Sequence, residues 1–369
     1  MNDLLFMRKA LQLAKKGIGQ VSPNPLVGAL IVKEEKIIGE GYHQYYGGPH
    51  AEINAFADAK ESVAGATLYI TLEPCCHYGK TGPCVDVIIE KKITKVVIAM
   101  IDPNPEVSGK GVEKLRKQGI EVVVGIAEKA CRQLNESFIY AITNNKPFVL
   151  MKYAMTADGK ITTNSGEGKW ITNPKSRRNV HKTRNAFQAI LTGINTVLID
   201  DPLLNCRIKN GNNPIRIIVD NDLKLPEDSR IAKTAKEIPT IVACVRENRK
   251  QIAILNDLGI KVIVTKRTKE NFVDLSDLME KLIELNIKSI MIESGAILNY
   301  AALEAGIVNT LQVYIGAQIF GGSKGRFPVE GPGIEKIVNS IKLELNKMVR
   351  FDNDIMLEYK VGSKVCLLE

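Results

Sequence analysis

The sequence predicts an α/β protein of two domains. Its 369 residues are about twice the length of a typical domain. Apolar segments of strand length alternate with segments whose apolar residues recur at helical spacing, which is typical of sheets covered by helices. A polar stretch, residues 143–147, ends in the helix breaker Pro147. We therefore place the domain boundary there, between residues 1–145 and residues 146–369.

A helix is predicted at the start of the first domain. Residues 3–16 carry apolar side chains at helical spacing, after the cap Asn2 and before the stop signal Gly17. The chain then continues as a sheet with helices on its faces. The predicted elements are a hairpin, two buried strands and a closing helix, at residues 26–32, 37–42, 66–72, 96–101 and 128–142.

The second domain is predicted to be a mostly parallel sheet whose last strands run antiparallel. Helical segments separate several of its strand-like segments, which is the pattern of βαβ units. The strand-like segments are residues 148–153, 189–192, 215–220, 240–245, 261–264, 289–292, 311–319 and 355–359.

The composition excludes several classes of protein. Hydrophobic residues make up 45% and charged residues 25%, so the chain can bury a core and is not disordered. The longest apolar runs, such as residues 96–101, are far shorter than a membrane span, and the N-terminus has no basic signal-peptide start. The seven cysteines are an odd number and are scattered apart from Cys75, Cys76 and Cys84, which favours thiols or metal ligands over a disulfide framework. We expect a cytoplasmic protein.

The net charge of +9 indicates an anionic partner. Residues 1–145 carry 17 basic and 16 acidic side chains, so most of the excess lies in the second domain. Basic residues there, such as Arg216 and Arg230, are spread singly, without the dense block or interleaved aromatics of a nucleic-acid surface. Phosphorylated small molecules fit this charge pattern better than RNA does.

Three of the four histidines and three of the seven cysteines lie close together in the first domain: His43, His50, His77, Cys75, Cys76 and Cys84. A zinc deaminase needs three imidazole or thiolate ligands, an open position for water, and a carboxylate that is not a ligand. His50, Cys75 and Cys84 can supply the ligands. Glu52 can take the proton from the water and pass it to the departing ammonia.

The spacing of the cysteines differs from the usual deaminase signature, where the two lie three positions apart; here the separation is nine. Cys76 is adjacent to Cys75, and their side chains diverge, so both binding one ion is awkward. Cys84 follows Pro83 at a predicted helix start, which favours a thiolate. The alternative is a closed structural site completed by His77 or Cys76. It leaves Glu52 without a role.

Three motifs of the first domain, residues 22–28 (SPNPLVG), 50–52 (HAE) and 71–84 (TLEPCCHYGKTGPC), together resemble the deaminase half of the bifunctional riboflavin-biosynthesis deaminase-reductases. The wider cysteine spacing is that family's own form. The resemblance implies a cytidine-deaminase-like fold, one zinc ion per chain on His50, Cys75 and Cys84, and Glu52 as the catalytic proton shuttle. It also implies that the pyrimidine or its ribose phosphate contacts Asn24, His43, His77 and Lys80.

The second domain has no Gly-x-Gly-x-x-Gly after a strand, so an ordinary dinucleotide fingerprint is absent. The predicted strand 289–292 runs into Gly295 and then a helical stretch. Such a junction presents free N–H groups to a pyrophosphate, although most junctions of this kind are only turns.

The second domain resembles the reductase half of the same family in residues 152–161, 170–173, 177–184 and 193–207. The resemblance implies a dihydrofolate-reductase-like fold that uses NADPH, with Asp200 near the nicotinamide and the reacting sugar. The residues implied at the substrate are Gly168, Arg184, Leu204, Arg207 and Glu293. Those implied at the cofactor are Ala154, Trp170, Thr196, Asp200, Gly295, Ala296, Ile297, Leu298, Asn299, Tyr300 and Ala301.

Two positions depart from the family's reductase pattern, because Gly168 stands where Ser is frequent and Ser294 where Gly is common. We expect altered local contacts there rather than lost activity.

Structural alternatives to these roles remain. Trp170 is equally well interpreted as a core anchor, and Arg184 as an arginine on a helix surface. Asp200 can be a plain loop start, and residues 102–105 a loop for which the resemblance adds a gating role.

The resemblance implies a bifunctional enzyme of riboflavin biosynthesis, a zinc hydrolase and an NADP-dependent oxidoreductase. The first domain would deaminate 2,5-diamino-6-ribosylamino-4(3H)-pyrimidinone 5′-phosphate. The second would reduce the ribosyl side chain, giving 5-amino-6-ribitylamino-uracil 5′-phosphate. The expected partner is this small phosphorylated substrate, with no nucleic acid and no membrane, and the family implies a homo-oligomer.

Two rival functions belong to other classes. A nucleic-acid-editing zinc deaminase with a C-terminal binding domain predicts a continuous basic face with exposed aromatics, yet aromatics total 5%. A zinc-stabilised binding module without catalysis predicts a metal site with no open position.

Overall fold

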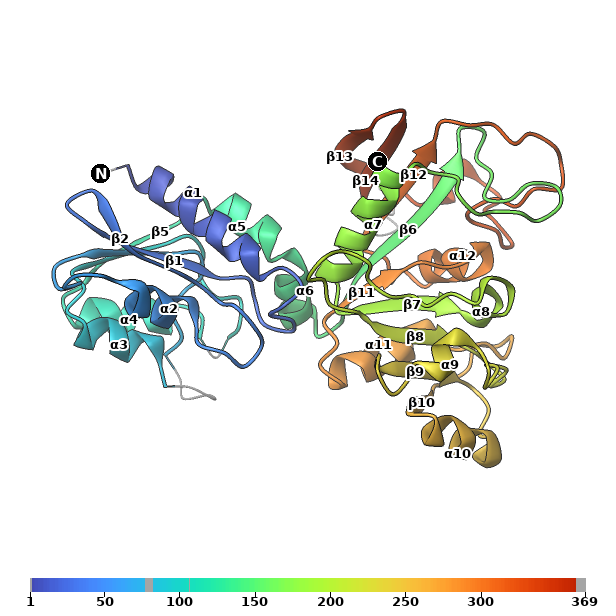
Figure 1. Cartoon of the computed structure of the whole chain (residues 1–369), viewed down its shortest axis with the longest axis horizontal. Helices are drawn as coiled ribbons and strands as arrows, with labels where there is room; N and C mark the ends of the chain where they lie inside the picture. The colour runs from blue at the N-terminus through green and yellow to red at the C-terminus, as the bar shows by residue number, and fades with distance from the viewer. Residues whose placement is uncertain (1, 77–81, 106, 363–369) are drawn as a thin grey trace. The chain divides into compact units, whose positions relative to one another are not determined.

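The computed structural model of this chain describes residues 2–76, 82–105 and 107–362. The chain forms two compact units, Met1–Asn145 and Lys146–Glu369 (Figure 1). The division falls inside the polar stretch 143–147, where the sequence predicted a boundary. Each unit has its own sheet and its own apolar core.

The first unit is built on a five-stranded sheet in the order β2-β1-β3-β4-β5. β1 runs antiparallel to β2 and β3, whereas β4 and β5 continue parallel to β3. The predicted hairpin is confirmed, and its two turn residues, Glu34 and Glu35, both have positive φ, as tight hairpin turns require. The strands are β1 (Gly28–Lys33), β2 (Lys36–Tyr42), β3 (Thr67–Ile70), β4 (Lys95–Ile98) and β5 (Glu121–Val124).

Helices cover both faces of this sheet (Figure 1). α2, α3 and α4 pack on one face through Ala55, Ile88 and Leu115, and α1 and α5 pack on the other through Met7 and Cys131. The helical elements are α1 (Asp3–Ala14), the short 3-10 helix η1 (Lys15–Gly17), α2 (Ala51–Asp58), α3 (Cys84–Glu90), α4 (Lys110–Lys117), α5 (Glu128–Leu134) and α6 (Glu136–Asn144).

The single closing helix predicted over 128–142 is wrong, because Asn135 separates α5 from α6. The buried Asn135 amide accepts a hydrogen bond from the Leu26 N–H at 2.8 Å and donates one to the Leu26 carbonyl at 3.0 Å. Such side-chain hydrogen bonds to backbone compete with helix continuation. Asn135 thus anchors the loop that carries Asn24.

The second unit is built on a nine-stranded sheet in the order β10-β9-β8-β7-β11-β6-β12-β14-β13. The strands from β10 to β12 are parallel, and β14 and β13 are antiparallel, as the sequence predicted for the last strands. β13 was not predicted. The strands are β6 (Phe148–Thr156), β7 (Ala189–Gly193), β8 (Ile215–Val219), β9 (Thr240–Cys244), β10 (Ile260–Val264), β11 (Ser289–Ile292), β12 (Thr310–Gly316), β13 (Leu343–Phe351) and β14 (Asp354–Val361).

The core of the second unit lies in two layers, one on each face of its parallel strands. Ile217 of β8 belongs to the layer that includes α11, and its neighbour Ile218 belongs to the layer that includes α8, α9 and α10. The helices are α7 (Pro174–Ala186), α8 (Ile194–Asp200), α9 (Arg230–Lys233), α10 (Arg249–Asp257), α11 (Leu275–Glu284), α12 (Ala296–Glu304) and η2 (Ile337–Asn339). Among the described residues, no helix has the length and apolar character needed to cross a membrane.

Candidate active sites

His50, Cys75 and Cys84 come together at the N-terminal ends of two helices in the first unit. His50 directly precedes α2, and Cys84 is the first residue of α3. Nδ1 of His50 lies 3.2 Å from Sγ of Cys84 and 3.5 Å from Sγ of Cys75. Tetrahedral zinc with ordinary bond lengths places its nitrogen and sulfur ligands about 3.6 Å apart. The three residues, here called the zinc triad, therefore fit a zinc ion.

Of the two residues considered as a fourth ligand, Cys76 is described by the structure and does not join the zinc triad. Within the described part of the chain, the group of possible ligand atoms that lie within 4.8 Å of one another has three members. Cys76 packs against the apolar core of the unit instead. His77 lies outside the described residues. Three protein ligands are typical of a catalytic zinc site with one open position.

The electrostatics of the zinc triad follow from its close packing. The Cys84 thiol and the Cys84 N–H both donate to Sγ of Cys75, and the thiol contact is the main cause that lowers the pKa of Cys75 to about 4. The same contact, followed by burial, raises the pKa of Cys84. One thiolate is therefore already favoured without a metal, and a cation would favour a second.

Glu52 lies in the first turn of α2, two residues after His50, and is 3% exposed. Burial raises the pKa of its carboxyl to about 7, although the nearby His50 acts in the opposite direction. The Cys84 side chain also contacts this carboxylate and lowers its pKa slightly. Glu52 is therefore held beside the zinc triad without belonging to it.

Two predicted recognition residues border the zinc triad. Nδ1 of the buried His43 donates to the Pro49 carbonyl at 3.0 Å, so its Nε2 accepts from the Asn24 amide at 3.1 Å. The His43 and His50 rings meet edge to face with centroids 5.8 Å apart. Lys80, like His77, lies outside the described residues.

The loop of residues 102–105 is held by the buried carboxylate of Glu73, which accepts from the N–H groups of Asp102 and Gly109 at 3.2 and 2.9 Å. Its gating role stays a prediction.

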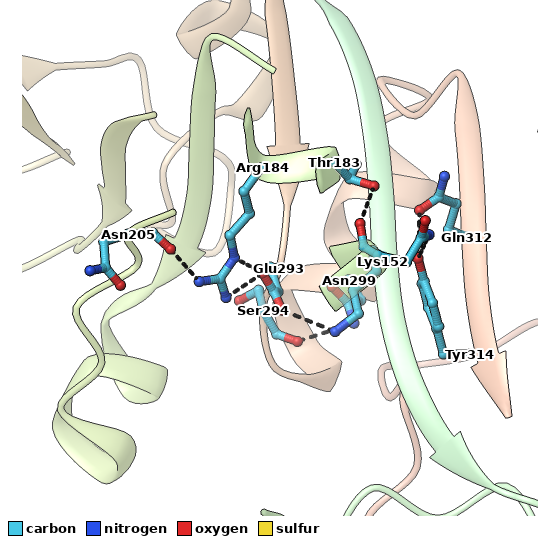
Figure 2. A network of polar contacts seen from close by, with 10 residues as sticks. Lys152, Thr183, Arg184, Asn205, Glu293, Ser294, Asn299, Gln312 and Tyr314 are labelled. Atoms are coloured by element: carbon cyan, nitrogen blue, oxygen red, sulfur yellow. Dashed lines mark hydrogen bonds and ion pairs between the residues drawn. The ribbon is translucent and has the colours of Figure 1, made fainter. Parts of the chain in front are cut away.

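A second group of charged side chains meets at the parallel sheet of the other unit (Figure 2). Glu293, directly after β11, accepts from Nζ of Lys152 at 2.9 Å and from Nε of Arg184 at 2.9 Å. Burial alone would raise the pKa of Glu293, but the two cations lower it to about 2. Only 11% of the Arg184 side chain is exposed, so the alternative of a surface arginine is wrong.

Lys152 is a member of this charged group to which sequence reasoning assigned no role. It stands in β6 between apolar residues, where a charged side chain is unusual in a buried parallel strand. That placement is the signal by which it could have been found. Its ammonium also lies 5.7 Å from the ring centroid of Tyr314.

The loop of residues 201–207 contains Arg207 and accepts a hydrogen bond from Arg184. Arg184 donates from Nη1 to the Asn205 carbonyl at 2.9 Å (Figure 2). The Arg207 N–H donates to Nδ1 of His181 at 3.2 Å, and burial, together with the two arginines, lowers the pKa of His181 to about 4. Leu204 is 5% exposed and its side chain lies in the core. A ligand would therefore meet the backbone of Leu204.

Two strand-to-helix junctions lie side by side at one edge of the sheet. The hydroxyl of Ser294, after β11, accepts from the N–H of Gly193, at the end of β7, at 3.0 Å. A Cβ atom added at Gly295 would lie 3.8 Å from Oγ1 of Thr196. Two predicted cofactor residues, Gly295 and Thr196, are thus neighbours, and the Ser294 hydroxyl makes a contact that a glycine at this position could not make.

The other predicted reductase residues lie in several different elements of the second unit. Trp170 is 68% exposed with the Arg177 guanidinium 4.3 Å from its ring centroid, so the core-anchor alternative is wrong. A Cβ atom at Gly168 would lie 2.6 Å from the Ile161 carbonyl, which excludes a serine there unless the backbone shifts. Asp200 is exposed at the end of α8. Ala154 lies in β6, and residues 296–301 lie in α12.

Comparisons with known proteins assign both units. Residues 1–100 match the family described as the cytidine and deoxycytidylate deaminase zinc-binding region, and residues 147–357 match the RibD C-terminal domain. The chain is 47% identical over 363 residues to the riboflavin biosynthesis protein RibD of Actinobacillus pleuropneumoniae, covering 98% of this chain and 96% of the relative. It is 42% identical over 359 residues to that of Aquifex aeolicus (strain VF5), covering 97% and 98%.

Solved structures of related proteins agree with this assignment of both units. Acinetobacter baumannii RibD, form 1, is similar with a TM-score of 0.88 and 35% identity, over 98% of this chain and 99% of that chain. A Thermotoga maritima diaminohydroxyphosphoribosylaminopyrimidine deaminase/5-amino-6-(5-phosphoribosylamino)uracil reductase is similar with a TM-score of 0.87 and 37% identity, over the same shares.

Proposed function

Because the chain belongs to the RibD family of bifunctional deaminase-reductases of riboflavin biosynthesis, we propose that its two reactions take place at the two sites described above. The zinc triad would deaminate the diaminopyrimidinone ribosylamino phosphate. The site at Arg184, Arg207 and Glu293 would hold the deaminated product while its ribosyl group is reduced. The observation that carries this proposal is the convergence of His50, Cys75 and Cys84 beside the buried Glu52.

The deaminase step needs a base, an acid and an oriented ring. His50, Cys75 and Cys84 would hold the zinc ion, which would supply a Lewis acid that lowers the pKa of water to about 7. Glu52 takes one proton from the attacking water and passes it to the amino group at C2 of the ring, which leaves as ammonia. Asn24 and His43 orient the pyrimidine, since their mutual hydrogen bond holds both side chains at the rim of the zinc triad.

The reductase step needs alignment more than acid-base chemistry. We propose NADPH as the hydride donor, lying along Thr196, Gly295 and the start of α12, where N–H groups at a helix start favour a pyrophosphate. Opening of the sugar makes its C1′ a hydride acceptor. Arg184 and Arg207 grip the substrate phosphate through charge-assisted hydrogen bonds. Asp200 would lie near the nicotinamide and the sugar, where it would either orient them or assist protonation of the opened ring.

We further propose a homo-oligomer and a cytoplasmic location. The sheet edge of the second unit supports the first, because β13 exposes large apolar side chains, with Leu345 56% and Met348 67% exposed. The free thiols of Cys75 and Cys84 suit a reducing compartment.

The test of the proposed function uses the full-length protein. Ammonia release is measured on the diaminopyrimidinone phosphate without NADPH, and loss of nicotinamide absorbance is then followed after NADPH is added. Removal of zinc by a chelator is expected to abolish ammonia release while the reduction of supplied deaminated product continues. Ammonia release that is unaffected by complete zinc removal would contradict the proposal.

A further inference from the structure

The loop of residues 201–207, here called the substrate loop, has a backbone that L residues rarely adopt. Asp201 has φ of 38° and Leu204 has φ of 50°. Left-handed conformations of residues other than glycine persist only where surrounding contacts hold them, and they cluster at functional sites. Contacts with the rest of the second unit must therefore hold this loop in its conformation.

Three guanidinium groups donate hydrogen bonds to every second carbonyl group of the substrate loop, those of residues 201, 203 and 205. Nη1 of Arg230 donates to the Asp201 carbonyl at 3.5 Å, and Nη1 of Arg216 donates to the Leu203 carbonyl at 3.4 Å. Nη1 of Arg184 donates to the Asn205 carbonyl at 2.9 Å, a contact drawn in Figure 2. The three arginines come from α9, β8 and α7, so the loop is fixed to three separate elements.

Arg216 differs from the other two arginines because it is completely buried, with 0% exposure. Within the described residues it forms no ion pair. Besides the Leu203 carbonyl, its donors reach four neutral oxygens at 2.8 to 3.0 Å, those of Thr240, Thr234, Ile231 and Ile238. A buried charge without a counter-ion is costly, and an apolar residue at the same place in β8 would avoid that cost. Packing of the core alone therefore does not explain the charged side chain of Arg216.

The shape of the guanidinium explains why an arginine stands at position 216. Nε and Nη2 are held by the segment from α9 to β9, and Nη1 is shared between Thr234 and the substrate loop. A lysine keeps the charge but has its three donors on one atom, so it cannot bridge these groups. Burial lowers the pKa of Arg216 to about 10, which leaves it charged at neutral pH with every donor present.

We propose that Arg216 is a positioning residue of the reductase, which fixes the Leu203 to Asn205 backbone so that Arg207 and Arg184 converge on the substrate phosphate. Arg230 has the same role at the start of the loop. This inference rests on the proposed function, because it takes Arg207 as a phosphate-binding residue.

The test compares steady-state reductase kinetics of full-length Arg216→Lys with wild type, at saturating NADPH. We expect the KM for the phosphorylated substrate to rise about 10-fold, the effect of losing one charge-assisted hydrogen bond. The KM for NADPH and the deaminase rate of the same chain should not change. Arg116→Lys is the matched control, because Arg116 makes an equivalent guanidinium-to-carbonyl hydrogen bond, to Val122, in the first unit.

The outcomes separate positioning from mere stability. A folded Arg216→Lys protein with a lower melting temperature but an unchanged substrate KM would overturn the proposal. If Arg216→Lys does not fold, the positioning role is tested with Arg230→Lys instead. The Arg230 side chain is exposed and is not part of the core. We expect its substrate KM to rise about threefold, and an unchanged value would likewise overturn the proposal.

Arg207→Ala, measured in parallel, distinguishes this inference from the proposed function. A raised KM in Arg207→Ala with a normal KM in Arg216→Lys leaves the phosphate site intact and overturns the positioning role. A normal KM in Arg207→Ala means that the phosphate site itself is wrongly placed.

Discussion

The zinc triad and the charged group around Glu293 are assembled in different ways. All three members of the zinc triad lie within residues 50–84, two of them, His50 and Cys84, at the starts of helices. Lys152 and Arg184 instead reach Glu293 from positions 141 and 109 residues away in the chain. The first site is a local motif, whereas the second forms because the neighbouring strands β6 and β11 bring Lys152 and Glu293 together and α7 adds Arg184.

The two sites also differ in their charge balance. The zinc triad consists of one imidazole nitrogen and two sulfur atoms, all of which donate electron pairs, so a cation completes it. Glu293 is already neutralised by two cations of the chain itself. The first site is therefore suited to an added cation, while the charges of the second are already balanced within the chain itself.

The largest expected effect comes from separating the two sites. Residues 1–145 and 146–369 each contain a complete sheet and core, so each fragment should fold alone. The first should release ammonia without NADPH, and the second should reduce the deaminated product without zinc, each with no trace of the other activity. Circular dichroism checks folding. Two folded fragments that both lack activity would show that the sites are shared across the boundary.

Replacing Glu52 tests the zinc triad alone. Glu52→Gln should lower the deaminase kcat by about 10²-fold or more, because it removes the group that carries the proton, while the zinc content and reductase rate stay normal. Metal analysis supplies the control: Cys84→Ser should lose zinc and Cys76→Ser should retain it. Normal ammonia release by zinc-loaded Glu52→Gln would remove Glu52 from the mechanism.

Replacing Glu293 tests the internal charge balance. The pKa of Glu293 is about 2 in the folded chain, below its ordinary value of 4.5, so its stabilisation is present above pH 4.5 and is lost as the pH falls towards 2. Glu293→Gln should therefore lower the free energy of unfolding by about 3 kcal/mol at pH 7 and by less at acid pH. Urea unfolding followed by the fluorescence of Trp170, the single tryptophan, measures the second unit.

The matched control for Glu293→Gln is Asp352→Asn, which removes an ion pair with Lys175 whose side chains are 55% and 67% exposed. Exposed pairs contribute about 0 to 1 kcal/mol. A pH-independent difference between Glu293→Gln and wild type would contradict the assigned charge state.

A smaller effect is expected at the proposed phosphate site. Arg207→Ala should raise the reductase substrate KM about 10-fold with little change in kcat, because it removes binding common to the ground and transition states. Asp200→Asn should mainly lower kcat, since it disturbs the alignment for hydride transfer. Kinetics in which substrate and NADPH are varied separately would reveal either pattern. Unchanged parameters in both variants would place the site elsewhere.

The smallest effect is expected at Ser294, whose hydroxyl joins the two strand-to-helix junctions. Ser294→Ala removes the acceptor for the Gly193 N–H, a loss of about 1 kcal/mol. The KM for NADPH should then rise about twofold to fivefold, with the substrate KM unchanged. A larger rise in the substrate KM than in the NADPH KM would mean that these junctions do not face the cofactor.

The sequence predicted the architecture well where strands are buried and apolar. It did not predict β5, which has four residues, or β13, whose side chains are mostly exposed and whose alternation of apolar and polar residues is interrupted at Asn346 and Lys347, where the register shifts. The break at Asn135 escaped prediction for another reason. It depends on a hydrogen bond to Leu26, 109 positions earlier, which no local pattern encodes.

The same contrast separates the predicted site residues from those that were missed. His50, Cys75 and Cys84 were predicted because histidines and cysteines cluster there, and because the wider cysteine spacing resembles that of the riboflavin-biosynthesis family. Lys152 and Arg216 were passed over because each is a single cation in an apolar strand, and its partners come from other strands and helices. A cation inside a predicted buried strand is therefore worth examining as part of a site.

The position of β6 has a consequence for the order of events during synthesis. β6 is the first strand of its unit along the chain, yet it lies between β11 and β12 in the sheet. The ribosome must therefore produce more than 130 further residues before Phe148 meets its partner Ser289, whereas the first unit is complete by Asn145. The nascent second unit exposes an apolar strand throughout that interval, and a chaperone that binds such strands would find its target there.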